Sequence, residues 1–147
     1  MQVFTIAAPG ARPLWILLPI AIVLAVTAAA MIAASRTARF EVSPAGLRLR
    51  GDFYGRLIPP DNLVIHNVRR VDFVRSPELE PKRRTMGTGL PGHQAGWFRL
   101  ANGGKALLYL TDRAKAVYVP TTSDYSLIMS PDDPEGFMAA LRAMRSQ

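Results

Sequence analysis

Residues 97–110 read WFRLANGGKALLYL, and this stretch decides the fold class of the chain. Trp97, Phe98 and Leu100 precede the Asn102-Gly103 step. After that step, alternate positions are apolar: Ala106, Leu108 and Leu110. Alternation with a period of two is typical of β-strands. Asn-Gly between two such runs is a strong hairpin signal, because both central residues of a type I′ turn need a positive φ. The stretch therefore predicts a β-hairpin with a type I′ turn.

Further strand candidates lie on both sides of this hairpin. Residues 39–43 and 47–50 alternate apolar and polar side chains. Between them, Ser43-Pro44-Ala45-Gly46 suits a type I turn, with Pro at the second position and Gly at the fourth. This pattern predicts a second hairpin near the start of the domain. The other strand candidates are residues 53–58, 63–66, 70–73, 117–119 and 125–129.

The end of the chain has the pattern of an amphipathic helix over about residues 133–145. Asp133 suits the N-cap and Pro134 the first helical position. Ser130 with Pro131 is the alternative start, although Pro134 would then remove an early intrahelical hydrogen bond. Side chains three and four residues apart form one apolar face: Phe137, Leu141 and Met144. We expect this face to cover one end of a β core.

These elements exclude a doubly wound α/β fold, because parallel strands need helical crossovers and no helical pattern separates the strand candidates. We therefore predict a mainly β domain, a partly open barrel or sandwich of about seven antiparallel strands with one C-terminal α-helix. The domain is assigned to residues 36–147.

The domain is preceded by an apolar segment. Residues 14–35 contain no charged side chain, and Arg12 and Arg36 flank them. As a helix rising about 1.5 Å per residue, the segment would span roughly 33 Å, enough to cross a hydrocarbon core about 30 Å thick. We interpret it as a single transmembrane helix after an N-terminal tail, residues 1–13. A cleaved signal peptide and a buried core helix are the alternatives, although the apolar run is longer than a signal h-region.

Basic residues near the segment indicate its orientation, because Lys and Arg resist translocation. Arg12 precedes the segment, whereas four arginines follow it: Arg36, Arg39, Arg48 and Arg50. The expected location is the cell (inner) membrane, with the C-terminal domain in the cytoplasm. The opposite orientation stays open, because Arg48 and Arg50 belong to a predicted strand.

Short motifs along residues 36–147 carry a family resemblance. They are Phe40-Glu41-Val42, Gly46-Leu47, Asp52-Phe53-Tyr54-Gly55-Arg56, Ile58-Pro59, Arg84-Thr85, Gly87, Leu90-Pro91-Gly92, Gly96-Trp97-Phe98, Asn102-Gly103, Tyr109-Leu110-Thr111-Asp112, Tyr118-Val119-Pro120 and Ser130-Pro131-Asp132-Asp133-Pro134. Together they resemble the bacterial pleckstrin-homology-like (bacterial PH) domains attached to an N-terminal membrane segment. The resemblance implies a PH-like fold, and it implies no particular ligand or activity.

Composition argues against catalysis. The 147 residues include no cysteine, which excludes disulfides, thiolate metal sites and cysteine nucleophiles. The two histidines, His66 and His93, have no carboxylate at ligand spacing, so we predict no catalytic residue, no metal site and no cofactor. The glycine-rich residues 87–92 lack the Lys-Ser or Lys-Thr of a phosphate-binding P-loop.

The formal net charge is +7, and several of the basic residues lie close together in the sequence, which indicates a binding surface. The candidate residues for partner or lipid binding are Arg69, Arg70, Lys82, Arg83 and Arg84. The last three fall in residues 76–96, which show no strand pattern and are expected to be a long interaction loop. A solvated strand face with local ion pairs is the alternative interpretation.

We therefore expect a membrane-anchored, non-enzymatic PH-like interaction module that binds a partner protein or anionic lipid headgroups at the membrane. The alternative is an extracytoplasmic structural or assembly domain that oligomerises or supports a membrane complex. A homo-oligomer is compatible with both. Nucleic acid is not an expected partner, because the basic residues are not interleaved with a platform of aromatic side chains.

Overall fold

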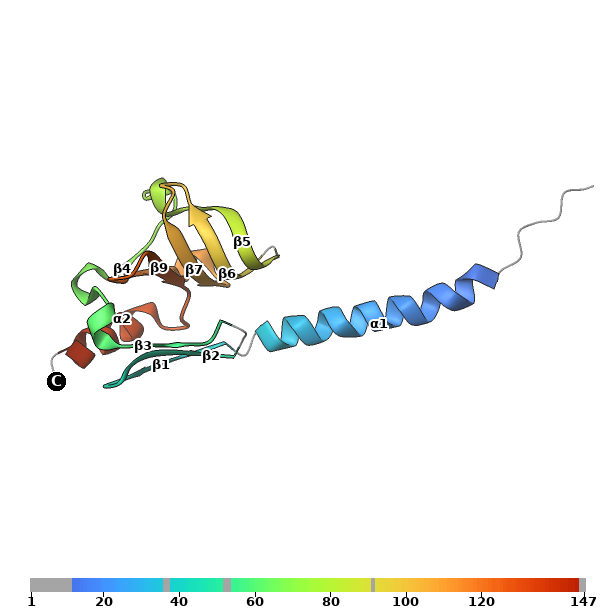
Figure 1. The fold of residues 1–147 in the computed structure, drawn as a ribbon, viewed down its shortest axis with the longest axis horizontal. Helices are drawn as coiled ribbons and strands as arrows, with labels where there is room; N and C mark the ends of the chain where they lie inside the picture. Colours follow the sequence, from blue (N-terminus) through green and yellow to red (C-terminus); the bar gives the residue numbers. More distant parts are fainter. Residues whose placement is uncertain (1–11, 36–37, 52–53, 91, 146–147) are drawn as a thin grey trace, which may run out of the picture. The chain divides into compact units, whose positions relative to one another are not determined.

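The computed structural model of the chain describes residues 12–35, 38–51, 54–90 and 92–145 (Figure 1). Two compact units make up the chain, Met1–Arg36 and Thr37–Gln147. The expectations for the N-terminal tail, for Arg36 and for Asp52-Phe53 concern residues outside the described ranges, apart from residues 12 and 13 of the tail.

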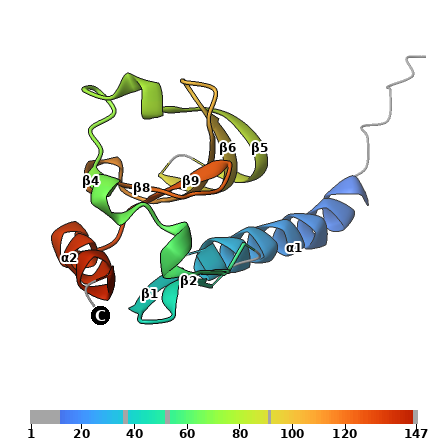
Figure 2. The ribbon, with the colours of Figure 1, turned by 60° about the vertical axis from the view of Figure 1, so that its left-hand side comes forward.

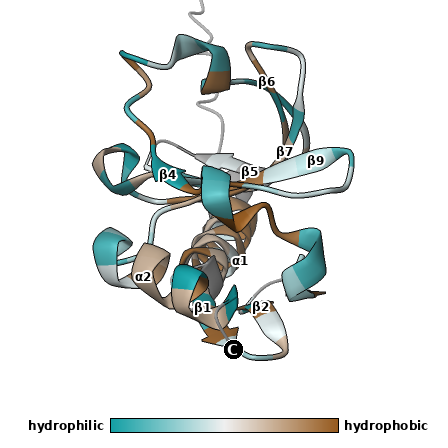
Figure 3. Ribbon diagram, turned by 90° about the vertical axis from the view of Figure 1, so that its left-hand side faces the viewer, coloured by the Kyte–Doolittle hydropathy of each residue, from teal (hydrophilic) through white to brown (hydrophobic). Residues whose placement is uncertain are grey.

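The first unit contains one long apolar helix, α1 (Arg12–Ser35). Brown and pale shades mark its apolar residues in Figure 3. From Trp15 to Ala33 the helix is long and apolar enough to cross a membrane, and none of this stretch is buried inside the protein. The helix α1 is therefore a candidate membrane span.

The described residues of the second unit form nine strands in two sheets. The three-stranded antiparallel sheet contains β1 (Arg39–Ser43), β2 (Gly46–Arg50) and β3 (Leu57–Ile58). The six-stranded sheet contains β4 (Arg69–Arg70), β5 (Pro81–Leu90), β6 (His93–Leu100), β7 (Lys105–Leu110), β8 (Val117–Pro120) and β9 (Tyr125–Met129). Its strand order is β4-β8-β9-β7-β6-β5, so β4 and β5 are its two edges. The mainly β class with a C-terminal helix is confirmed.

Within the described strands, one pair departs from the expected antiparallel arrangement. β9 runs parallel to β7, with Lys105 opposite Tyr125 and Tyr109 opposite Met129. β8 lies on the far side of β9 and is antiparallel to it. Because β8 carries the chain back along the sheet, this parallel pair needs no helical crossover.

Both predicted hairpins are present, β1–β2 and β6–β7. The turn between β6 and β7 is not type I′, because Asn102 does not have a positive φ. Gly103 alone takes the left-handed conformation, at φ +83°, and its N–H donates to the carbonyl of Leu100. This is the three-residue loop in which a type I turn is followed by a left-handed glycine.

The expected long loop over residues 76–96 is wrong, because most of this stretch is the β5–β6 hairpin. β5 has two register shifts, between Pro81 and Arg83 and between Arg84 and Met86, which interrupt the period of two. Exposed side chains follow one another from Lys82 to Met86. An irregular strand at a sheet edge thus has no alternating pattern to detect.

Three other strand expectations also shift. Of the described part of residues 53–58, Leu57–Ile58 forms the strand. Residues 63–66 contribute an isolated bridge from Leu63 to Thr121 and the start of a 3-10 turn, Ile65–Asn67. The strand expected at residues 70–73 is Arg69–Arg70, and the chain then continues as a connector, residues 71–80. The connector includes the 3-10 turn Pro77–Leu79.

The inner strands β7 and β9 of the six-stranded sheet are buried on both faces. One face carries Leu107, Leu127 and Met129, which pack in a cluster with residues of the three-stranded sheet such as Leu47 and Leu49. The opposite face carries Phe98, Leu108 and Ile128, and the connector covers it with Val71, Phe73 and Leu79. The buried residues of both clusters lie between Leu47 and Met144. The described core is therefore assembled from the second unit alone.

The helix α2 (Pro134–Arg145) completes the first cluster, and Figure 2 shows it beside the β strands near the C-terminus. Asp133 is its N-cap, because its Oδ1 accepts a hydrogen bond of 3.0 Å from the N–H of Gly136. The predicted apolar face, with Met138 added, is buried: Phe137, Met138, Leu141 and Met144. The helix begins where the sequence places it.

Candidate functional site

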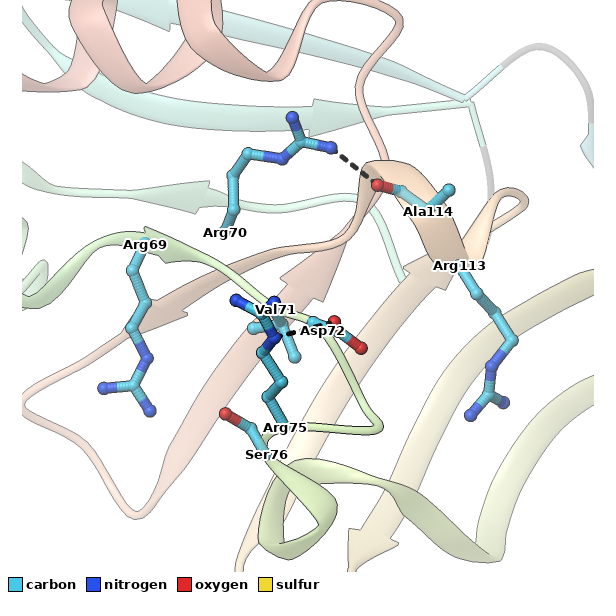
Figure 4. A pocket seen from close by; sticks show the side chains of 8 residues that line it. All are labelled: Arg69, Arg70, Val71, Asp72, Arg75, Ser76, Arg113 and Ala114. Atoms are coloured by element: carbon cyan, nitrogen blue, oxygen red, sulfur yellow. Dashed lines mark hydrogen bonds and ion pairs between the residues drawn. The ribbon is translucent and has the colours of Figure 1, made fainter.

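Four arginines surround an open pocket in the second unit. The pocket has a volume of about 620 Å³ and lies between β4, the turn after it and the 3-10 turn Arg113–Lys115 (Figure 4). Its lining residues are Arg69, Arg70, Val71, Asp72, Arg75, Ser76, Arg113 and Ala114. Among the described lining residues the four arginines face one carboxylate, that of Asp72.

The pairing of β4 with β8 positions the first two arginines. Arg69 lies opposite Tyr118 in this ladder, and its guanidinium carbon is 5.5 Å from the centre of the Tyr118 ring. Arg70 reaches the other way, where its Nη2 donates a hydrogen bond of 2.6 Å to the carbonyl of Ala114. Its Nη1 is 3.6 Å from a carboxylate oxygen of Glu135. Contacts within the domain thus orient both guanidiniums in the absence of a ligand.

A tight turn after β4 presents the third arginine. The Asp72 carbonyl accepts hydrogen bonds from the N–H groups of Arg75 and Ser76, at 3.0 and 2.8 Å. The Asp72 carboxylate accepts a further bond of 2.9 Å from the N–H of Val74. The Arg75 side chain is 88% exposed and its Nε is 3.7 Å from Asp72. Val74, at the tip of the turn, is an apolar residue that is 89% exposed.

Arg113 lines the side of the pocket opposite Arg69, and Figure 4 shows Arg75 between them. Asp112 starts its 3-10 turn by accepting a hydrogen bond of 2.9 Å from the N–H of Ala114. The Arg113 guanidinium lies 4.6 Å from the centre of the Phe73 ring.

Glu80 holds Arg113 at the rim of this site. Arg113 Nη2 is 3.2 Å from one Glu80 oxygen, and Lys82 Nζ donates a bond of 2.8 Å to the other. The hydrogen bond from Lys82 and the positive charges of Lys82 and Arg113 lower the pKa of Glu80 below its ordinary value. The Glu80 carboxylate is therefore ionised at neutral pH and offsets part of the positive charge of Arg113.

The structure separates the five residues that the sequence suggested as one site. Arg69 and Arg70 line the pocket from β4, whereas Lys82, Arg83 and Arg84 lie on β5, at the opposite edge of the six-stranded sheet (Figure 1). Two further lining arginines, Arg75 and Arg113, are not among the candidates predicted from the sequence. No sequence signal links Arg113 to β4, because a long-range strand pairing brings them together.

The arrangement suits binding of an anion. Arginine guanidiniums donate paired hydrogen bonds to phosphate or carboxylate oxygens. The described lining contains no histidine, and Asp72 is its one carboxylate. Among the described residues, no group of three or more His, Asp or Glu side chains could hold a metal ion.

The histidines lie at two smaller depressions elsewhere in the domain. His66 lines one with Ile65, Arg142 and Arg145. His93 lines another, of about 290 Å³, between the β5–β6 turn and the end of β7. Neither brings a described histidine beside a carboxylate.

Two β-sheets with one C-terminal helix packed on their core are consistent with a pleckstrin-homology-like fold. Residues 38–144 match the sequence model of the bacterial PH domain. The chain belongs to this family. No curated protein and no solved structure matches the chain. PH-like domains are generally non-enzymatic interaction modules.

Proposed function

We propose that this protein is a membrane-anchored, non-enzymatic PH-like interaction module whose arginine pocket binds the phosphate groups of anionic lipids. The observation that carries the proposal is the set of four arginines around one open pocket, with a single carboxylate in the lining. Phosphate is a better match than a lone carboxylate for several guanidiniums, because it offers more acceptor oxygens and accepts paired hydrogen bonds.

The tip of the turn after β4 favours a lipid over a soluble phosphate. Val74 exposes an apolar side chain to solvent, directly next to the exposed Arg75. An apolar residue beside basic residues suits the boundary between headgroups and acyl chains, because the apolar side chain can contact the acyl chains while the basic side chains contact the headgroups. Each basic residue near an anionic surface adds about 1 kcal/mol of attraction.

The candidate span α1 supports an anchor in the cell (inner) membrane, and Arg39 after it supports a cytoplasmic domain. The rival is an extracytoplasmic assembly domain. Fusion of alkaline phosphatase or green fluorescent protein to the C-terminus distinguishes them. We expect fluorescence without phosphatase activity, and the reverse pattern would favour the rival.

Vesicle flotation of the domain, residues 37–147, tests the lipid proposal, since its described core needs no part of α1. We expect the domain to float with vesicles that contain phosphatidylglycerol but not with vesicles of phosphatidylcholine alone, and to float less as salt increases. Absence of flotation at low salt would contradict the proposal and would favour a protein ligand for the pocket.

Paired variants separate pocket binding from general attraction. Arg70→Gln with Arg113→Gln removes two charges from the pocket, and we expect about a ten-fold loss of vesicle binding. Arg48→Gln with Arg145→Gln removes the same charge from two exposed positions outside the pocket. An equal loss in both pairs would mean that net charge alone attracts the domain. Thermal unfolding of each variant checks that it is folded.

A further inference from the structure

The outer edge of β5 is a long strand edge without a partner in the described structure. β5 covers Pro81–Leu90 and pairs on one side with β6, and it ends the strand order of its sheet. Figure 1 shows it at the margin of the domain. At such an edge, alternate backbone N–H and C=O groups point outward and are free to pair with another chain.

The features that protect an edge are confined to the first half of β5. Proline, basic side chains and bulges all discourage strand pairing. Pro81, the three bases and both register shifts lie before or at Met86. From Met86 to Leu90 the register with β6 is continuous, the sequence carries no charge, and Met86 is 61% exposed. The second half is therefore an open, regular edge.

Two of the three bases next to this open edge have no partner within the described residues. Lys82 is held by Glu80 at 2.8 Å. Arg83 and Arg84 are exposed, and neither has an ion pair or hydrogen bond in the described part of the chain. Arg84 extends along its own strand, because its Nη1 would lie 3.3 Å from a Cβ added at Gly89. Positive charge thus reaches beside the regular half of the edge.

We propose that β5 is a docking edge for an extended acidic segment of a partner protein, which adds to the sheet as a further strand. Its backbone pairs with Met86–Leu90, and carboxylates at one of its ends meet Arg83 and Arg84. Charge complementarity selects this occupant, because a second copy of the chain would bring the same basic strand. The site differs from the arginines of β4, which lies at the other edge of the sheet, although Glu80 pairs with both Lys82 and the pocket residue Arg113.

The test uses the full chain in nonionic detergent micelles and two fluorescent nonapeptides. Each peptide alternates valine and threonine over six residues and carries three glutamates, at its N-terminus in one and at its C-terminus in the other. Fluorescence anisotropy at about 20 mM salt measures their affinity. We expect one peptide to bind at least about ten-fold more tightly than the other, because strand pairing fixes direction whereas charge alone does not.

Backbone methylation isolates the strand pairing. The better peptide is N-methylated either at its odd or at its even positions, and only one of the two sets faces β5. We expect methylation of one set to abolish binding, and methylation of the other set to change the affinity by less than about two-fold relative to the unmodified peptide. Equal effects of both sets, or no binding of the unmodified peptides, would overturn the proposal.

Protein variants locate the contact. Arg83→Gln with Arg84→Gln should weaken the better peptide about ten-fold or more, whereas Arg48→Gln with Arg145→Gln should change it less than about two-fold. Arg69→Gln with Arg70→Gln, which changes the two pocket arginines of β4, should also leave it unchanged. Loss of binding in the pocket pair but not in the β5 pair would overturn the proposal and place the peptide in the pocket.

Discussion

The guanidinium of Arg113 lies 3.2 Å from the carboxylate of Glu80, and this ion pair connects the turn after β7 to the residue that precedes β5. Glu80 comes from the connector that covers one face of the sheet, and Arg113 lines the arginine pocket. Glu80 therefore competes with any anion that approaches Arg113.

Neutralising this carboxylate should strengthen anion binding. We expect Glu80→Gln to raise the affinity of the domain for phosphatidylglycerol vesicles about three-fold, because Arg113 loses its carboxylate partner. Glu78→Gln is the matched control, because it removes one negative charge from an exposed position two residues away. An equal gain in both variants would assign the effect to net charge, and unchanged binding in Glu80→Gln would remove Arg113 from the proposed site.

The lowered pKa of Glu80 predicts a pH-dependent contribution to stability. Because the folded-state pKa lies below the ordinary value of 4.5, the contribution is complete above that value and is lost as pH falls through the folded-state pKa. Urea unfolding at about pH 7 and about pH 3 should show that acid destabilises the unaltered domain more than Glu80→Gln. The Glu78→Gln domain should follow the unaltered one, and identical acid sensitivity in all three would contradict the assignment.

The packing of α2 is testable at Leu141, whose side chain is fully buried in the first cluster. Leu141→Ala should lower the free energy of unfolding by about 2 to 5 kcal/mol, because it removes buried apolar surface and leaves a cavity. Arg145→Ala, on the exposed side of the same helix, should change it by less than about 0.5 kcal/mol. A loss below about 1 kcal/mol for Leu141→Ala would show that α2 contributes little to the core.

Two glycines face each other where β5 meets β6. Gly87 and Gly96 are paired in register, with φ values of +122° and +121°. A Cβ added at Gly96 would collide with the carbonyl oxygen of Met86 and lie 2.7 Å from the Gly87 Cα. Gly96→Ala should therefore lower the free energy of unfolding by more than about 2 kcal/mol.

The control for this substitution is Gly103, which also has a positive φ but has no atom within 4 Å of an added Cβ. Gly103→Asn should cost less than about 1 kcal/mol, because asparagine tolerates the left-handed conformation. Chemical denaturation measures both variants. If Gly96→Ala is as mild as Gly103→Asn, the two strands can separate at this point without loss of stability.

Several elements could be predicted from the sequence because their signals are local. Asp133, Pro134 and the apolar spacing that follows specify the start and the buried face of α2 within a few residues. The Asn102-Gly103 step was sufficient for the β6–β7 hairpin. The same step did not specify the turn type, because a three-residue loop can join the same two strands with one left-handed residue instead of two.

Other features depend on contacts between distant parts of the chain. β5 has no local pattern, because consecutive side chains from Lys82 to Met86 are all exposed, and only pairing with β6 makes it a strand. The pocket depends on the β4–β8 ladder, through which Arg70 bonds to a carbonyl 44 positions away. Turn chemistry and periodicity act over a few residues and can be predicted from them. The pairing partners of a short strand depend on backbone hydrogen bonds and burial across the whole domain. In this domain that pairing brings Arg70 and Arg113 to the same pocket and places Arg83 at the opposite edge of the sheet.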